Sequence, residues 1–213
     1  MKITKIPVAT IMRMSVYSRF LTQLNHDGIE MASSSDIADG AGVTSAQVRK
    51  DLAYFGEFGI RGVGYNIKEL NEHIRKILHL GDEWRLALVG IGSLGRALIM
   101  HKGFREHGFA VNCIFDNDPA KIGGFFEGVE VLPAEKIREA VSQKKADIGV
   151  ICVPAAQAQN VADALVEGGI KAILNFASVN LVTPPSIHVR NVDLTVQLEV
   201  LTFQAGESIG RYG

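Results

Sequence analysis

Three glycines at fixed spacing are the residues of this chain whose pattern points most directly to chemistry. Gly90, Gly92 and Gly95 form G-x-G-x-x-G directly after an apolar run at residues 86–89. Such a run predicts a buried parallel strand, and the glycines allow a sharp turn and close approach of the backbone to a ligand. Because unpaired N–H groups at a helix start attract anions, the stretch predicts a pyrophosphate site.

An acidic residue follows where a dinucleotide site requires one. Residues 111–115 predict a second strand, and Asp116 ends it, about 20 residues beyond the glycines. A carboxylate there accepts hydrogen bonds from ribose hydroxyls and repels a 2′-phosphate, so NAD is favoured over NADP. The alternative is a tight turn without a ligand. The predicted cofactor residues of this unit are Gly90, Ile91, Gly92, Ser93, Leu94, Gly95 and Asp116.

The second half of the chain repeats this alternation of strands and helices. Residues 148–153 predict another buried strand, and a strand at 172–175 leads into a turn. Ligands of open α/β sheets bind at the carboxyl ends of the strands, so Val153, Pro154 and Ala177 are predicted to flank the nicotinamide. The expected fold class is α/β, with a Rossmann-like NAD(H)-binding domain at residues 84–191.

Residues 1–80 predict a separate helical domain that presents other polar side chains. Apolar residues recur at spacings of three and four through Ile11, Met14, Tyr17, Leu21 and Leu24, as on one face of a helix. Capping signals at residues 33–36 and 44–47 start two further helices, with a glycine turn between them. This order is typical of a helix-turn-helix unit, whose second helix reads a major groove.

The third predicted helix has an inner and an outer face. Val48, Leu52 and Phe55 form the inner face, and the outer face carries the predicted DNA contacts Ser45, Gln47, Arg49 and Lys50. Residues 58–65 then alternate glycine with other residues, which favours a short hairpin, or wing, with Arg61 reaching a narrow minor groove. The alternative is a small helical cap with a solvated charged face.

The C-terminal residues 192–213 predict one helix with an unusual surface. Asp193 can cap a helix of about 16 residues. Its apolar residues cover more than one face: Leu194, Val196, Leu198, Val200, Leu201 and Phe203. Such a helix needs burial on several sides, either on its own domain or, as we favour, in a partner subunit.

Composition narrows the functional classes. A formal net charge of −1 argues against a nucleic-acid binder that is basic over its whole surface. This average charge is compatible with a local basic patch. No signal peptide or long apolar run is evident, so we expect a cytoplasmic protein without a membrane partner. Cys113 and Cys152 fall in predicted strands, where buried free thiols are expected in preference to a redox pair.

Two enzyme classes compete with a DNA-binding function. A dehydrogenase needs a proton donor or acceptor at the nicotinamide, and no His or Lys is suitably placed near the predicted strand ends. A subunit of a CoA ligase would have a similar nucleotide domain but would leave the winged helix unexplained. We therefore predict no enzyme activity, no catalytic residue and no metal site.

Taken together, these motifs resemble the Rex family of redox-sensing bacterial repressors over nearly the whole chain. The most specific segments are QVRKDLAYFG at 47–56, RGVGY at 61–65, the glycine pattern, ILNFA at 173–177 and NVD at 191–193. The resemblance implies a homodimer joined through its Rossmann domains and a C-terminal helix that each subunit places in the other. It also implies binding of double-stranded operator DNA when NADH is scarce relative to NAD⁺, and release when NADH closes the dimer.

The resemblance also assigns residues to the switch between the two forms. Arg13, Arg19 and Asp193 occupy positions tied to the domain contacts that differ between them. His101 stands where the family often has a tyrosine that contacts the aspartate. The operator sequence, the regulated genes and the nucleotide affinities do not follow from the sequence.

Overall fold

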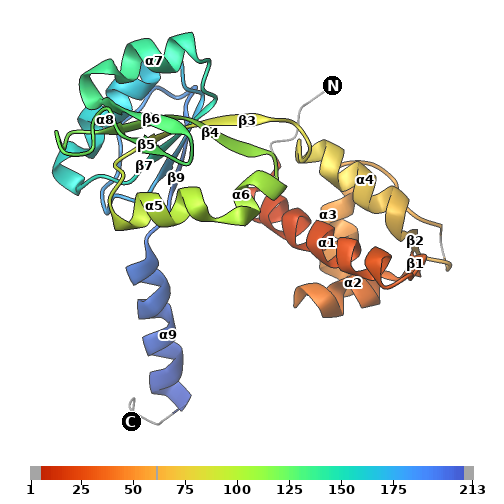
Figure 1. Cartoon of the computed structure of the whole chain (residues 1–213). Coiled ribbons are helices and arrows are strands. Elements are labelled where there is room, and N and C mark those ends of the chain that lie inside the picture. Colours follow the sequence, from red (N-terminus) through yellow and green to blue (C-terminus); the bar gives the residue numbers. More distant parts are fainter. Residues whose placement is uncertain (1–5, 61, 209–213) are drawn as a thin grey trace. The chain divides into compact units, whose positions relative to one another are not determined.

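The computed structural model describes residues 6–60 and 62–208, and the chain divides into two compact units, Met1–Asp82 and Glu83–Gly213 (Figure 1). The first unit has one buried apolar core, and the second has one on each face of its sheet. Within the described ranges, no helix is long and apolar enough to cross a bilayer.

The first unit combines helices with a two-stranded sheet. Its elements are α1 (Val8–His26), β1 (Met31–Ala32), α2 (Ser34–Ala41), α3 (Ser45–Ala53), β2 (Tyr65–Asn66) and α4 (Ile67–Ile77). The strands β1 and β2 pair antiparallel. Ile60 and Gly64 exchange backbone hydrogen bonds of 2.9 and 3.0 Å, which closes the predicted wing turn. The pairing of β2 with β1 was not predicted, and Arg61 lies outside the described residues.

Side-chain caps begin the two helices of the helix-turn-helix unit. Ser33 Oγ accepts from the N–H groups of Ser35 and Asp36, and Asp36 accepts from the Ser33 N–H at 2.7 Å, which completes a capping box at α2. Thr44 Oγ1 accepts from the Gln47 N–H at 3.2 Å and starts α3. The side chain of Gln47 donates to Asp51 instead of returning to the Thr44 N–H, so α3 has a single side-chain cap and no capping box.

The core of the first unit buries most of the apolar stripe predicted for α1. Met14, Tyr17 and Leu21 are at most 1% exposed. Ile11 is 40% exposed, and Thr10 is buried in its place. The reason is helical geometry, because Thr10 lies one full turn before Met14 on the inner face, whereas Ile11 is rotated away from it.

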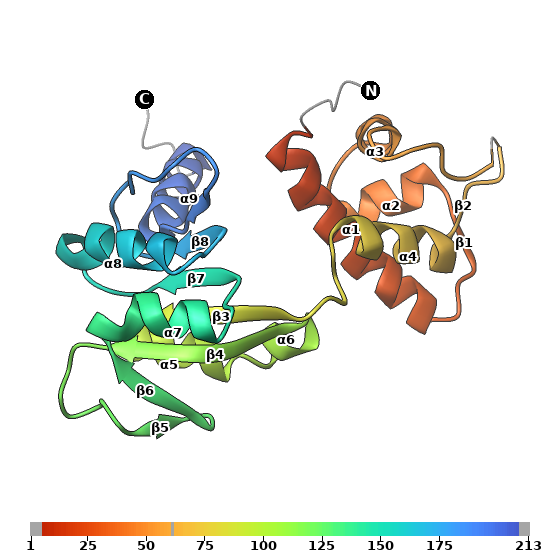
Figure 2. The ribbon, with the colours of Figure 1, turned by 90° about the horizontal axis from the view of Figure 1, so that it is seen from above.

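The second unit is a seven-stranded sheet with helices on both faces. Its elements are β3 (Trp84–Val89), α5 (Ser93–Met100), α6 (Lys102–Glu106), β4 (Phe109–Asp116), β5 (Phe125–Phe126), β6 (Val129–Pro133), the 3₁₀ turn η1 (Ala134–Lys136), α7 (Ile137–Gln143), β7 (Ile148–Ile151), α8 (Ala155–Glu167), β8 (Ala172–Asn175), β9 (His188–Asn191) and α9 (Leu194–Ser208). The strand order is β5-β6-β4-β3-β7-β8-β9, with only β5 antiparallel, and Figure 2 shows this order from β5 to β8.

Alternation of side chains along the strands supplies two apolar layers. Ala87 and Val89 of β3 join the core under α7 and α8, while Leu86 and Leu88 join the core under α5 and α6. Figure 1 shows these helix pairs on opposite sides of the sheet. Both faces are covered, as expected for parallel strands rich in apolar residues. The carboxyl ends of β3, β4 and β7 therefore meet at one edge.

Candidate functional site

The glycine loop between β3 and α5 uses its three glycines for different reasons. Gly90 has φ +94°, and a Cβ there would lie 2.6 Å from the carbonyl oxygen of Cys152. A Cβ on Gly95 would collide with the carbonyl oxygen of Gly90. Gly92 has φ −79°, and a Cβ there would meet no atom within 4 Å. The first and third glycines thus serve the fold, and the second leaves space beside the loop.

That space is part of a cavity of about 180 Å³ at the carboxyl edge of the sheet. It is lined by Val89, Gly90, Gly92, Asp116, Asn117, Lys121, Ala134, Cys152, Val153, Pro154, Gln157 and Val161. Five of the predicted cofactor residues, two of them loop glycines, are in this set. The lining combines apolar walls with a carboxylate, an amide and an ammonium group, which suits a ligand with flat and polar parts.

The other predicted cofactor residues lie around the cavity without lining it. The side chain of Ile91 is 2% exposed and belongs to the core beneath α5, so only its backbone is available to the loop. Ser93 and Leu94 are exposed at the start of α5, and Gly95 packs under the loop. Ala177 is 7% exposed and packs in the core beneath α8.

Asp116 is tied to the loop that it faces. Its Oδ2 accepts from the Ile91 N–H at 2.9 Å and from Lys121 Nζ at 3.2 Å, and its Oδ1 accepts from the Asp118 N–H at 2.9 Å. Burial by itself would raise the pKa of Asp116, but these three donors together hold the pKa below its usual value. The group is therefore ionised at neutral pH and fixes the glycine loop as well as facing the cavity.

Lys121 is a charged cavity residue that the sequence pattern did not predict. Its ammonium lies 3.2 Å from Asp116 and 3.5 Å from Asp118, so two carboxylates hold it. The only signal was its position one turn after Asp118 in the bend that follows β4. Cys152, also in the lining, is a free thiol whose pKa burial raises to about 12, which leaves it protonated and poorly nucleophilic at neutral pH.

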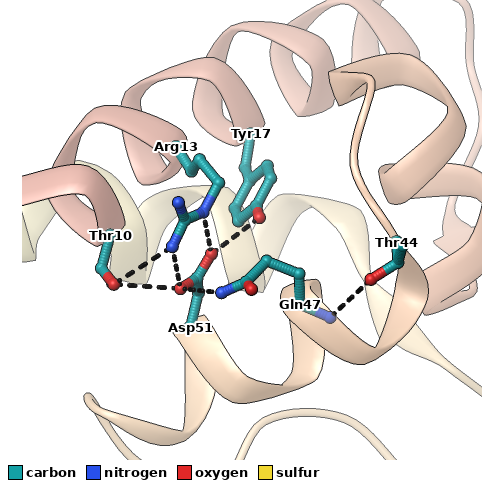
Figure 3. Close-up of polar contacts among 6 residues, drawn as sticks. All are labelled: Thr10, Arg13, Tyr17, Thr44, Gln47 and Asp51. Carbon is teal, nitrogen blue, oxygen red and sulfur yellow. Dashed lines mark hydrogen bonds and ion pairs between the residues drawn. The ribbon is translucent and has the colours of Figure 1, made fainter.

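The predicted DNA-contacting face of α3 is partly as expected. Arg49 and Lys50 are exposed, and Arg49 Nη1 donates to Ser34 Oγ of α2 at 2.8 Å. Ser45 is half-buried in the first turn. Gln47 turns inward and donates from Nε2 to Asp51 at 2.9 Å (Figure 3), which differs from the outward direction that the helical pattern predicts. The carboxylate of Asp51 draws the amide in.

The residues assigned to the switch lie in different settings. Arg13 forms a two-pronged ion pair with Asp51 inside the first unit. Arg19 is exposed on α1, and its Nε donates to the Ser15 carbonyl at 3.3 Å. His101 is exposed between α5 and α6, next to the ring of Phe104. Asp193 accepts from the Thr195 N–H at 2.9 Å and so caps α9, as predicted.

Metal-binding groups are not gathered in the part of the chain that the structure describes, since no three His, Cys, Asp or Glu side chains meet there.

Two family models match separate parts of the chain. Residues 5–53 match the model described as "Putative DNA-binding protein N-terminus", and residues 82–179 match the model described as "CoA binding domain".

Relatives match over nearly the whole chain. The redox-sensing transcriptional repressor Rex of Desulfitobacterium hafniense is 59% identical, over 97% of this chain and 98% of its own length. Rex of Carboxydothermus hydrogenoformans is also 59% identical, over 95% and 98%.

Solved structures agree with this match. The crystal structure of RSP with β-NAD⁺ and operator DNA has a TM-score of 0.91 at 36% identity and covers 96% of this chain and 94% of RSP. RSP with β-NADH has a TM-score of 0.87 at 34% identity, with 96% of each chain covered.

Proposed function

The chain belongs to the Rex family of redox-sensing transcriptional repressors, and we propose that it binds operator DNA through α3 and releases the DNA when NADH occupies the cavity beside Gly92. The observation that carries this proposal is the presence in one chain of a capped helix with exposed Arg49 and Lys50 and of a glycine loop open to a cavity. A repressor that responds to a nucleotide needs both parts.

The residues of the nucleotide site are proposed from the cavity and the loop. The pyrophosphate lies beside Gly92, where the backbone is unobstructed and the N-terminus of α5 favours an anion. Asp116 accepts from the adenosine ribose, so NADH and NAD⁺ are bound in preference to their 2′-phosphorylated forms. Val153 and Pro154, which line the cavity, mark the nicotinamide end, and Ala177, buried beneath α8, remains a prediction for that end. RSP, a Rex-family repressor, has been crystallised with both β-NAD⁺ and β-NADH.

The DNA site is proposed from the exposed surface of α3. Arg49 and Lys50 contact the bases or phosphates of a major groove, with Ser45 at the N-terminal end of the helix. Arg61, which lies outside the described residues, remains a prediction for the minor groove.

The enzyme alternatives are less well supported than a repressor. The relatives that match over 97% and 95% of the chain are named as transcriptional repressors, so the prediction of a non-enzymatic protein is confirmed. The match to a CoA-binding model covers only residues 82–179 and leaves the first unit unexplained.

We further propose a homodimer in which α9 packs against the partner subunit. Within one chain the large apolar side chains of α9 are 46–62% exposed, from Leu194 to Phe203. So much exposed apolar surface on one helix indicates an interface. Because bacterial operators lie in the cytoplasm, we propose that the protein acts there.

One titration tests the proposal. A duplex selected by the purified protein from a random-sequence pool is titrated at fixed total nucleotide while the ratio of NADH to NAD⁺ is varied. We expect tight binding at low NADH and release as NADH rises. Binding that is the same at every ratio contradicts redox control, and failure to select any duplex contradicts DNA recognition.

A further inference from the structure

A buried carboxylate joins the proposed DNA-reading helix to the first helix of the chain. The Asp51 cluster consists of Thr10, Arg13 and Tyr17 of α1 together with Gln47 and Asp51 of α3 (Figure 3). Asp51 is 0% exposed, although it lies among residues expected to face DNA. No feature of the proposed nucleotide or groove contacts explains a charge in this core.

The hydrogen bonds of the Asp51 cluster use the carboxylate fully. Oδ1 accepts from Thr10 Oγ1 at 3.0 Å, Arg13 Nη2 at 2.7 Å and Gln47 Nε2 at 2.9 Å. Oδ2 accepts from Arg13 Nε at 2.6 Å and Tyr17 OH at 2.9 Å. A carboxylate offers about four lone-pair sites, so these donors leave no place for water. The charge-assisted fork from Arg13 is also directional.

This geometry fixes the rotation of α3. Successive residues of a helix point about 100° apart, so Arg49, two positions before Asp51, points to nearly the opposite side. If α3 rotated about its own axis by one residue, about 100°, Asp51 would move away from Arg13. The rotation would leave a buried charge unpaired. The inward bonds of Asp51 therefore set the outward direction of the groove-facing side chains.

Apolar packing between α1 and α3 fixes the rotation of α3 less firmly than the hydrogen bonds of the Asp51 cluster do. α1 packs mainly on α4 and α2, and it approaches α3 over only a short stretch. Val48 and Leu52 anchor α3 in the shared core. Apolar contacts are non-directional, so they tolerate a rotation of α3 about its axis. The Asp51 cluster is thus the main directional link between the two helices.

We propose that Asp51 is a positioning residue for DNA recognition, which holds α3 at the rotation that directs Arg49 and Lys50 to the bases. It contacts no DNA itself and acts through the helix that it anchors. This inference rests on the proposed DNA-binding function. Sequence discrimination, more than overall affinity, depends on the cluster, since phosphate contacts tolerate small rotations that base contacts do not.

The test compares two duplexes. One is selected from a random-sequence pool by the wild-type protein, and the other is a shuffled duplex of the same composition. The discrimination ratio is the Kd for the shuffled duplex divided by the Kd for the selected one. Partial unfolding lowers the active fraction for both duplexes equally, so it leaves this ratio unchanged.

Three variants and a control are measured as full-length proteins. Asp51→Asn keeps the shape but removes the charge, Tyr17→Phe removes one donor, and Arg13→Lys keeps the charge but loses the fork. Asp39→Asn makes the same substitution as Asp51→Asn at an exposed position of α2. We expect the discrimination ratio to fall about tenfold for Asp51→Asn and about threefold for Tyr17→Phe, while the salt slope of both variants stays at the wild-type value. The discrimination ratio of Asp39→Asn should equal that of the wild type.

Each outcome decides a different question. If the wild type selects no duplex, the proposed function fails. If the wild type discriminates and the ratio is unchanged in Asp51→Asn, the positioning role is overturned. If Asp51→Asn does not fold, the ratios of Tyr17→Phe and Arg13→Lys decide, and wild-type ratios in both overturn the inference. An equal loss in Asp39→Asn also overturns it, because the effect is then not specific to the Asp51 cluster.

Discussion

Gly92 is the glycine of the loop at which a side chain should affect ligand binding without disturbing the fold. Its φ of −79° is open to any residue, and a side chain there meets no protein atom within 4 Å. Gly90 and Gly95 allow no such separation, because side chains at both would strike backbone oxygens. A substitution at Gly92 therefore acts mainly on whatever occupies the cavity.

We expect Gly92→Val to abolish the nucleotide response while DNA binding remains. The isopropyl group occupies the proposed pyrophosphate space, and NADH affinity should fall by about two orders of magnitude or more. The folded state should lose about 1 kcal/mol, since valine is a poor N-cap residue. Calorimetry measures the affinity for NADH, and a DNA-release titration measures the nucleotide response. Gly92→Ala is the milder control in both. Release at the wild-type NADH concentration would show that the cofactor lies elsewhere.

Asp51 predicts an acid-sensitive first unit. Burial alone would raise the pKa of Asp51, but hydrogen bonds, first from Arg13, hold it below its usual value. A depressed pKa stabilises the fold above the unfolded value, about pH 4, and this stabilisation is lost as the pH falls through the folded value. Tyr17 stabilises the cluster up to alkaline pH, since burial raises the pKa of its hydroxyl and the neutral form donates to Asp51.

We expect Asp51→Asn to destabilise the first unit by about 3 kcal/mol at pH 7, because the substitution leaves Arg13 without its buried partner. The difference from wild type should shrink as the pH falls below about 4. Hydrogen exchange of the α1 and α3 amides from pH 3 to 7 measures it, with Asp39→Asn as the matched control. A difference that stayed constant down to pH 3 would mean that the charge of Asp51 is not what the cluster stabilises.

At the scale of the element, α3 divides its residues between the core and the proposed groove. Val48, Asp51 and Leu52 are buried, whereas Arg49 and Lys50 are exposed. Because the exposed pair makes few contacts within the unit, replacing either should leave the fold intact. Their effects should therefore appear in DNA binding alone.

We expect Arg49→Ala and Lys50→Ala to weaken binding to the selected duplex in distinguishable ways. Loss of a base contact relaxes sequence preference by about 1–3 kcal/mol, and loss of a phosphate contact weakens all sequences alike and lowers the salt slope by about one. Titrations with selected and shuffled duplexes at several salt concentrations separate the two. Wild-type affinity in both variants would exclude this face of α3 from the interface.

At the scale of the whole molecule, α9 carries apolar surface that one chain leaves uncovered. Leu198 is 62% exposed and Leu201 is 57% exposed. Since transfer of such side chains out of water is favourable by about 1.5–3 kcal/mol each, burying them in the proposed dimer would contribute to its stability.

We expect Leu198→Asp to raise the dimer dissociation constant about 100-fold or more, because a charge would be buried in the interface. Val182→Asp, at an 80% exposed apolar residue of the same unit, is the matched control and should leave the dimer intact. Analytical ultracentrifugation across a concentration series measures both. A Leu198→Asp protein that remains dimeric at nanomolar concentration would place the interface elsewhere.

The switch across the dimer gives the last prediction. If His101 donates to Asp193 of the partner subunit in the NADH form, that hydrogen bond stabilises the form that releases DNA. His101→Ala and Asp193→Ala should each raise the NADH concentration needed for release, and His101→Tyr, which keeps a donor, should raise it less. Release is measured by titrating NADH into the DNA complex of the wild type and of the three variants. Wild-type release in both alanine variants would refute the switch.

The amino-acid sequence by itself determined those features of this protein that depend on near neighbours. The G-x-G-x-x-G turn, the capped starts of α2 and α3, the Asp193 cap and the apolar strands were all predicted and are present. Each depends on residues a few positions apart, whose geometry the local backbone dictates. The resemblance to Rex repressors came from the same short segments.

Only the tertiary structure decided how distant residues meet. Asp51 interrupts the apolar inner face of α3, and that irregularity was its only sequence signal. Its partners on α1 lie 34 to 41 positions away. The inward turn of Gln47, the pairing of β1 with β2 and the position of Lys121 in the cavity were likewise not predicted. A buried charge is stable only where several donors converge, and that convergence is set by how helices pack, which residue spacing along one helix does not contain.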